Sequence, residues 1–499
     1  MRPQATSTEL SSALRRGMPW IIVGQIASQV ISLAAISCLF RLVEPAAFGL
    51  IGMALPWIML PRMLATLGLS TAGVQRQSLS NEERATLFWL QASLGLAFTL
   101  VAAALAPLAS SIYQASEVST LITILAPSVL IAALGATHQA LLERQMQLAR
   151  VTIVRLVGQT LGAVAAVFVA WNDGQASALV VQQYGELLTL AVSAWLADPW
   201  WPGWPKRWSG ARQFLHFSGY YSLSSLFFVL VQSADKFLLG LWLGSTVEGQ
   251  AVVGAYTQAY SLMMRPVYLV TTPVIGVLLP ALSRAASERR LFGELAIAAF
   301  RLAAILLLPC CMGLFAVSVE VMETLGGESR HTTAILLAAL APAIFAQGWI
   351  NLCGTVLAAR GQTKLLSFMA GMVLVVTLQA LAAGYWFGQQ IPAFATIPAL
   401  GVAWGLTLAT MLLVIPYVWT TYRAVEISPA ALLVTFVRPL RTSLLMGLTV
   451  LLVRSQLPTE WPAAARLVAL LLVGMLSYGL LLGSDRAWLI QKVRTGRGV

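Results

Sequence analysis

The chain has 499 residues, of which 58% are hydrophobic and only 10% are charged, and its formal net charge is +12. Soluble globular domains carry about 25% charged residues, and surface-to-volume scaling would leave much of this apolar surface in water. The composition therefore excludes a soluble fold and predicts an integral membrane protein.

Fourteen apolar segments are long enough to cross a bilayer, which takes about 20 residues each. In chain order they are 18–40, 48–70, 85–107, 118–142, 151–171, 175–196, 213–243, 250–282, 292–318, 332–358, 363–388, 394–420, 432–453 and 462–483. The first lacks a signal-peptide cleavage pattern and is expected to be retained. The short connections exclude a soluble catalytic or nucleotide-binding domain.

The basic residues predict the orientation, because Lys and Arg accumulate in cytoplasmic loops. With the N-terminus inside, 22 of the 31 basic residues fall on the inner side; four fall outside (Arg41, Arg330, Arg454, Arg466) and five within spans (Arg62, Arg155, Lys236, Arg265, Arg301). We therefore expect both termini in the cytoplasm. The charge of +12 is explained by basic loops beside anionic lipid headgroups, and we expect membrane lipids but no nucleic acid as partners.

A segment rich in Trp and Pro, Trp195 to Trp208, separates the sixth and seventh spans. Tryptophan prefers the membrane interface, and proline interrupts helices. We predict an aromatic anchor on the cytoplasmic face; a platform on which sugars stack is the sharper alternative. The predicted divisions are an N-lobe, this linker, a C-lobe, and two final spans with a basic tail: 1–196, 197–212, 213–420 and 421–499.

An internal repeat is indicated by a shift of 205 positions. It aligns Gly49, Ala54, Met59 and Pro61 with Gly254, Ala259, Met264 and Pro266. Lobe duplication is common in transporters. We therefore predict an all-α polytopic membrane protein with 14 transmembrane helices, arranged as two pseudo-symmetric six-helix lobes plus two C-terminal helices. Prolines within the spans predict bent helices.

The residues give little support for an enzyme. The aspartates are isolated, the sequence has no Gly-x-x-x-x-Gly-Lys phosphate loop, and the four cysteines lie in apolar runs without metal-ligand spacing. We expect no enzymatic activity, no cofactor and no metal site, although a spatial triad cannot be deduced from residue order.

Charged residues inside the spans are the candidate site residues, because an ion at mid-bilayer costs roughly 2.5–3.5 kcal/mol. Arg62 follows a helix-bending proline deep in its span, and Arg265 precedes Pro266. Both are predicted to line a cavity. Arg155 and Arg301 lie near the cytoplasmic ends of their spans, where their side chains can reach the headgroups.

Asp235 and Lys236 are adjacent in the seventh span. Neighbours on a helix point about 100° apart, so we expect one to line the lobe interface and the other to reach the outer headgroups. A buried carboxylate can carry a proton, which makes Asp235 a proton-coupling candidate. A salt bridge to a basic residue on another span is the alternative. Glu186 is the second candidate.

Several short motifs occur in a fixed order between residues 18 and 370. They are RLVEPAAFG (41–49), LGLS (67–70), QR (75–76), LFW (87–89), QALL with an Arg two residues later (139–144), ALVVQQ (178–183), DKFLLG (235–240), LG (243–244), GAY (254–256) and LPALSR (279–284). Together they resemble the polysaccharide transporter family, which includes colanic-acid-type exporters and O-antigen flippases. Arg155 and Lys236 depart from that pattern, since similar sequences often have an acid and a neutral residue there.

The resemblance implies a transporter of the multidrug/oligosaccharidyl-lipid/polysaccharide exporter superfamily, with two bundles around a cavity that opens to each side in turn. The implied cargo is an undecaprenyl-diphosphate-linked oligosaccharide, flipped across the bacterial inner membrane for exopolysaccharide or O-antigen synthesis. A polysaccharide polymerase and a chain-length regulator are the implied protein partners. Arg62, Arg265, Lys236 and Arg155 are candidates for neutralising the diphosphate.

Three alternatives stay open. A cation-coupled multidrug extruder of the same superfamily would need acids in its cavity, whereas in-span bases outnumber in-span acids here. A peptidoglycan lipid-precursor flippase would also have fourteen spans and a cationic cavity. A membrane-embedded polymerase or glycosyltransferase would need a long periplasmic loop, and the predicted outer connections are short.

Overall fold

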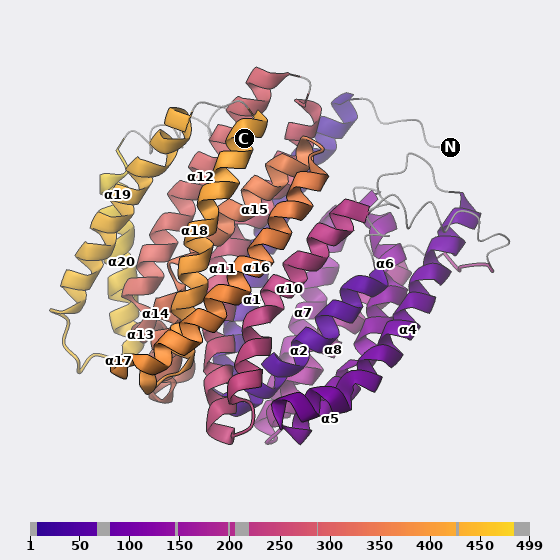
Figure 1. Cartoon of the computed structure of the whole chain (residues 1–499). Coiled ribbons are helices and arrows are strands. Elements are labelled where there is room, and N and C mark those ends of the chain that lie inside the picture. The colour runs from indigo at the N-terminus through magenta and orange to yellow at the C-terminus, as the bar shows by residue number, and fades with distance from the viewer. Residues whose placement is uncertain are drawn as a thin grey trace. The chain divides into compact units, whose positions relative to one another are not determined.

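The computed structural model describes residues 7–66, 80–144, 148–197, 200–204, 219–286, 288–425 and 429–483. Every regular element within these ranges is a helix (Figure 1), so the expected all-α class is confirmed. Contacts divide the chain into two compact units, Met1–Gly254 and Ala255–Val499.

Membrane-spanning helices dominate both units. Among the described residues, twelve helices are long and apolar enough to cross a bilayer, and one pair bent by 46°, His331–Leu340 with Ala343–Ala359, would make a thirteenth. Each of the fourteen predicted segments overlaps one of these or α8 (Gln175–Ala197). The helix α8 carries Gln182, Gln183 and Glu186 and lies outside that set, so a count of fourteen crossings stays a prediction.

The first unit contains α8 and the helices that surround it. These are α1 (Ser7–Leu42), α2 (Pro45–Thr66), α4 (Asn81–Tyr113), α5 (Ser116–Leu125), α6 (Pro127–Arg144), α7 (Leu148–Trp171) and α10 (Gly219–Leu243), together with the start of α11 (Val247–Arg284). The helix α4 shows how local sequence sets an element's limits. It begins at a capping box, in which Ser80 Oγ accepts from the Glu83 backbone N–H and Glu83 Oε2 accepts from the Ser80 N–H. It ends where Gln114 adopts a left-handed conformation with φ of 53°.

Glycines allow two close helix crossings in this unit. A Cβ on Gly185 of α8 would lie 2.5 Å from the Gly162 Cα of α7, so these helices touch backbone to backbone. A Cβ on Gly49 of α2 would overlap the Gln250 carbonyl oxygen, and a Cβ on Gly254 would overlap that of Pro45. Because the 205-residue shift maps Pro45 to Gln250 and Gly49 to Gly254, this contact is reciprocal, as a two-fold relation between repeats would make it.

The second unit begins within α11. It continues with α12 (Arg289–Ala316), α13 (Ser318–Gly326), a 3₁₀ turn (Glu328–Arg330), α14 (His331–Leu340), α15 (Ala343–Ala359), α16 (Thr363–Gln390), α17 (Pro392–Ala395), α18 (Ala399–Val425), α19 (Pro429–Arg454) and α20 (Ala463–Leu481). The last two helices lie side by side (Figure 1).

Two ion pairs hold this last helix pair against α13. Arg454 Nε lies 2.7 Å from Glu320 Oε1, and Arg466 Nη2 lies 2.7 Å from Glu323 Oε2. An apolar cluster of Ala316, Val317, Val450 and Leu470 packs beside them. Two of the four basic residues predicted on the outer side are therefore neutralised by carboxylates at one end of α13.

The boundary between the two contact units lies after α10, at Gly254 and Ala255 within α11. The sequence predicts the lobe boundary earlier, at 197–212. By contacts, α10 belongs with the helices before it. Residues 205–212 of that linker lie outside the described residues, and the division into lobes at 1–196 and 213–420 stays a prediction.

Candidate functional site

A cavity of about 440 Å³ lies between α2, α6 and α10 in the first unit. Its wall contains the predicted site residue Arg62, together with Met59, Met63, Thr66, Ala132, Ala136, Gln139, Ala140, Val229 and Gln232. Most of the wall is apolar, and Arg62 is the charged member of this set. A guanidinium in such surroundings is poorly hydrated and therefore attracts anions strongly.

The Arg62 side chain is held by a neutral partner. Its Nη2 donates to Ser128 Oγ at 2.7 Å, while its buried Nε has no hydrogen-bond acceptor in the described part of the chain. A hydroxyl oxygen orients the guanidinium without cancelling its charge. The arrangement therefore leaves donor capacity and positive charge for a ligand.

A helix break positions Ser128. Pro127 starts α6 directly after α5, and a proline in a membrane helix leaves backbone groups that neighbours must satisfy. Two carbonyls at the break receive side-chain hydrogen bonds, from Tyr184 Oη to the Ile124 oxygen at 2.5 Å and from Thr99 Oγ1 to the Ala126 oxygen at 3.3 Å. Arg62, Thr99 and Tyr184, from three different helices, therefore brace the same bend.

Glu186 lies in the electrostatic surroundings of Arg62. The carboxylate charge of Glu186 on α8 acts on the guanidinium, and the Glu186 side chain is exposed. The structure thus brings together one predicted cationic candidate and one predicted proton-coupling candidate, at a longer range than an ion pair.

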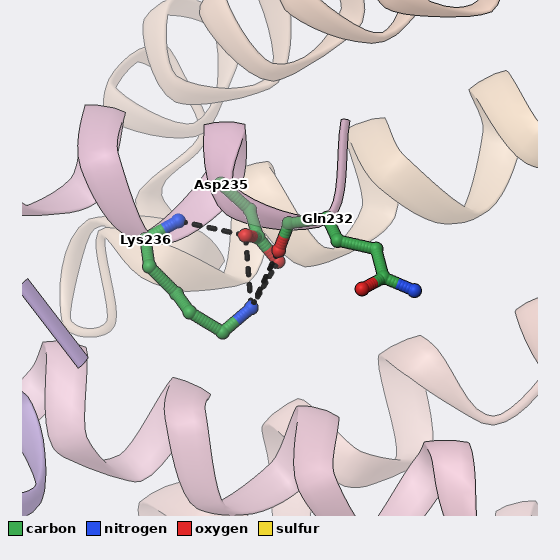
Figure 2. Close-up of polar contacts among 3 residues, drawn as sticks. All are labelled: Gln232, Asp235 and Lys236. Atoms are coloured by element: carbon green, nitrogen blue, oxygen red, sulfur yellow. Dashed lines mark hydrogen bonds and ion pairs between the residues drawn. The ribbon is translucent and has the colours of Figure 1, made fainter. Parts of the chain in front are cut away.

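Asp235 and Lys236 form a buried ion pair within α10 (Figure 2). Lys236 Nζ lies 2.9 Å from Asp235 Oδ1 and 3.1 Å from Oδ2, and the residues are 1% and 9% exposed. The expectation that one side chain lines an interface while the other reaches the headgroups is therefore wrong for this structure. The base that the structure shows bonded to Asp235 is the next residue, and a salt bridge from Asp235 to a basic residue on another span stays a prediction.

The physical reason is the length of the lysine side chain. The angle of 100° describes where the Cα–Cβ bonds point, but the flexible four-carbon stem of Lys236 curls back over the helix to its neighbour. The Lys236 ammonium also donates to the Gln232 carbonyl oxygen at 3.3 Å. Gln232 lines the Arg62 cavity, and its side-chain amide points away from the ion pair (Figure 2), so the pair lies one helical turn from the cavity wall.

The other candidates lie elsewhere. Arg155 is exposed on α7 and is not among the residues that line the cavity. Arg265 is half-buried on α11 in the second unit, beside Pro266. Arg301 is half-buried on α12.

Sequence reasoning missed the neutral polar residues of the site. Ser128, Gln139 and Gln232 carry no charge, so a search for charged residues within spans passes over them. The signal that was available is Pro127, since a proline at the middle of a span predicts a break whose backbone groups need side-chain partners.

The tryptophan-rich segment 200–204, which follows α8, is fixed to α6 and α4. The Trp195 indole N–H donates to the Leu134 oxygen at 3.1 Å, and the His138 ring, 4.1 Å from that of Trp195, places Nε2 3.1 Å from the Trp200 oxygen. Trp89 stacks on Trp204 at 4.5 Å. Trp208 and the other linker residues at 198–199 and 205–212 lie outside the described residues.

Comparison with known proteins agrees with this architecture. The family model described as "Polysaccharide biosynthesis protein" matches residues 38–334. The succinoglycan biosynthesis transport protein ExoT of Rhizobium meliloti is 23% identical over 96% of this chain and 94% of its own length. The teichuronic acid biosynthesis protein TuaB of Bacillus subtilis is 22% identical over 78% of each chain, and the lipopolysaccharide biosynthesis protein WzxC of Escherichia coli is 21% identical over 70% of each.

Solved structures share the fold. The lipid II flippase MurJ in an inward closed conformation superposes with a TM-score of 0.73 at 14% identity, over 94% of this chain and all of that one. An inward-facing multidrug resistance transporter of the MATE family superposes with a TM-score of 0.61 at 15% identity, over 82% and 98%. Because the family model covers more than half of the sequence, the chain belongs to the polysaccharide biosynthesis protein family.

Proposed function

We propose that this protein transports a lipid-linked oligosaccharide across the bacterial inner membrane by alternating access. The cargo would be joined to undecaprenol through a diphosphate and flipped for exopolysaccharide or O-antigen assembly. The similarity to a succinoglycan biosynthesis transport protein and a lipopolysaccharide biosynthesis protein supports this class of cargo.

The observation that carries the proposal is Arg62 in its cavity. The Arg62 guanidinium is bonded to a neutral hydroxyl and surrounded by apolar side chains. Such a site suits a cargo that carries one anionic group on an otherwise uncharged molecule. Arginine binds phosphate through two parallel N–H···O bonds, which are charge-assisted and strong. In this proposal Arg62 contacts the diphosphate, and Gln139 and Gln232 offer hydrogen bonds to the first sugars.

The predicted orientation gives the direction of loading. With a cytoplasmic N-terminus, α2 and α6 both run from the outer to the inner side, so their C-terminal ends are cytoplasmic. The cavity reaches Thr66 and Ala140 near those ends. Cargo made on the inner leaflet would therefore enter the first unit from the side on which it is synthesised.

The buried pair in α10 suits proton coupling. Protonation of Asp235 would remove the negative charge that holds the Lys236 ammonium. That ammonium, already 3.3 Å from the Gln232 carbonyl, could then turn toward the cavity and add a second cation for the diphosphate. Loss of the proton would restore the pair and weaken the hold on the cargo.

A second candidate is favoured by the fold. The superposition on the lipid II flippase MurJ favours a peptidoglycan lipid-precursor flippase, whose cargo would carry the same diphosphate linkage. A multidrug extruder has less support, because the charged side chain in the described cavity wall is an arginine.

Gene deletion in the native host, followed by complementation, tests the function. We expect surface polysaccharide to stop while lipid-linked repeat units accumulate on the inner leaflet, and the Arg62→Ala gene to fail in complementation while the exposed-site control Arg155→Ala restores output. Loss of the repeat units themselves would indicate an enzyme. Rescue of cells depleted of their lipid II flippase would assign the peptidoglycan precursor instead.

A further inference from the structure

A second hollow lies on the opposite flank of α6 from Arg62. It is a groove of about 540 Å³ between α6 and α8, with Leu134, Leu188 and Val192 in its walls. The rings of Trp195, Trp200 and Trp201 form its end. All of its lining residues are apolar or aromatic.

Hydrogen bonds fix the shape of this groove. The Trp195 indole is bonded to the Leu134 carbonyl across the groove, at 3.1 Å. The Trp200 backbone is tied to His138 at 3.1 Å. Walls that are already ordered lose little conformational entropy when a ligand enters, which favours binding.

The groove opens away from the helix core. Val192 is 55% exposed and Trp201 is 82% exposed, and most of α6 belongs to the candidate membrane span Ser116–Leu141. The medium around such a surface is hydrocarbon, and a groove without polar partners holds no ordered water. The groove therefore suits a hydrocarbon chain, and tryptophan rings of this kind prefer the level of the headgroups.

We propose that this groove holds the polyprenyl tail of the cargo during loading, before its diphosphate enters the Arg62 cavity; this inference rests on the proposed function. The fourth span, α5–α6, separates the two hollows, since Ala136 and Gln139 line the cavity and Leu134 lines the groove. Alternate spans run the same way, so the Trp200 end of the groove and the Thr66 end of the cavity face the same side of the membrane. An amphiphile with its tail in the groove thus has its anionic head on the side from which the cavity loads.

The walls suit a polyprenyl chain better than a bilayer acyl chain. Each isoprene unit contains a double bond, so it has fewer freely rotating bonds per carbon than a saturated chain, and ordering it costs less conformational entropy. Its methyl branches also add apolar surface that the indole rings can cover. Both differences favour a polyprenyl chain over an acyl chain in this groove.

Photo-crosslinking tests the occupant directly. The full-length protein, carrying p-benzoylphenylalanine in place of Val192, is reconstituted in phosphatidylcholine vesicles that contain tritiated undecaprenyl phosphate. The control carries the same group in place of Val164, which is 63% exposed on α7. We expect several-fold more tritium at position 192. Equal capture at the two positions, or capture of phosphatidylcholine alone at 192, overturns the tail site.

A bulky substitution provides a second test. Val192→Trp fills the groove from its open side and should lower polysaccharide output several-fold, whereas Val164→Trp adds the same bulk to a lipid-facing position and should not. Normal output from Val192→Trp overturns the tail site as well.

The two proposals fail in different ways. If crosslinking shows no preference for position 192 while Arg62→Ala still stops export, the tail site is wrong and the proposed function stands. If polyprenyl capture at 192 occurs but Arg62→Ala exports normally, the groove binds polyprenyl lipid and the proposed role of Arg62 in cargo binding is wrong.

Discussion

Arginines in two regions of this protein lie among apolar helices but have different partners. In the cavity of the first unit, Arg62 is held by the neutral hydroxyl of Ser128. At the end of α13 in the second unit, Arg454 and Arg466 are held by the carboxylates of Glu320 and Glu323. A carboxylate neutralises the charge, so the arginine serves to stabilise the packing of helices. A hydroxyl orients the guanidinium and leaves its charge available to an anion. In the function proposed above, the partner, more than the depth in the membrane, distinguishes an arginine that binds cargo from a structural one.

Removing the cation of the first region should have the largest effect. A charge-assisted hydrogen bond is worth about 1.5–3 kcal/mol, and each 1.4 kcal/mol is tenfold in affinity. Arg62→Ala should therefore reduce polysaccharide export by about 10- to 100-fold at an unchanged protein level in the membrane. Arg62→Lys, which keeps the charge but loses the two-pronged geometry, should recover part of it.

The comparison would be broken if Arg454→Ala, produced to the same level, reduced export as strongly as Arg62→Ala. Both measurements use the amount of surface polymer per unit of transporter in the membrane.

Removing a carboxylate of the second region should act on stability. Glu320 is 1% exposed but the Arg454 side chain is 32% exposed, so water can partly compensate the charge that remains, and the cost is below the roughly 3 kcal/mol of breaking a fully buried pair. Glu320→Gln should lower the melting temperature of the detergent-solubilised protein while the remaining folded protein still exports.

The charge-reversed double variant Glu320→Arg with Arg454→Glu is the matched control. It should recover part of the lost stability. If each single variant melts at the wild-type temperature, the Glu320–Arg454 pair does not stabilise the protein.

Asp235 and Lys236 share features of both regions. Their charges neutralise each other in an ion pair, as in the second region, but the pair lies one helical turn from the cavity of the first region. Asp235→Asn leaves a buried ammonium and should lower the protein level as well as transport. The double variant Asp235→Asn with Lys236→Gln removes both charges, so it should restore the protein level. Its transport should be several-fold weaker and no longer respond to a proton gradient.

Transport is measured in inverted vesicles with and without that gradient. A double variant that keeps the wild-type response would leave the pair with a structural role alone.

The sequence predicted the fold class and the position of Arg62 because both follow from local rules. The lengths of the apolar segments predict the spans. A cation directly after Pro61, deep in a span, avoids the hydrocarbon most readily by facing a cavity. The ion pairs Glu320–Arg454 and Glu323–Arg466 could not be predicted in the same way, since their partners lie 134 and 143 residues apart in the chain.

The Asp235–Lys236 pair was mispredicted for a different reason. Helical geometry fixes the direction of the Cα–Cβ bond, but it does not fix the end of a four-carbon side chain. Ser128 was missed because its role depends on Arg62 from another helix. In each case the missing information is the three-dimensional neighbour of a side chain.

Breaking the second ion pair of α13, Arg466–Glu323, should have the smallest effect on stability. It allows the two ion pairs of the second region to be compared with each other. Both side chains of the Arg466–Glu323 pair are partly exposed, at 21% and 26%, whereas in the Arg454–Glu320 pair the arginine is 32% exposed but the carboxylate only 2%. Partial exposure lowers both the desolvation cost and the strength of a pair, and solvent-accessible pairs are worth about 1 kcal/mol or less. Glu323→Gln should therefore lower the melting temperature less than Glu320→Gln does, and added salt should reduce the difference from wild type because accessible charges are screened. Equal losses from the two variants would mean that helix packing, and not burial of the charges, sets the strength with which α19 and α20 are held to α13.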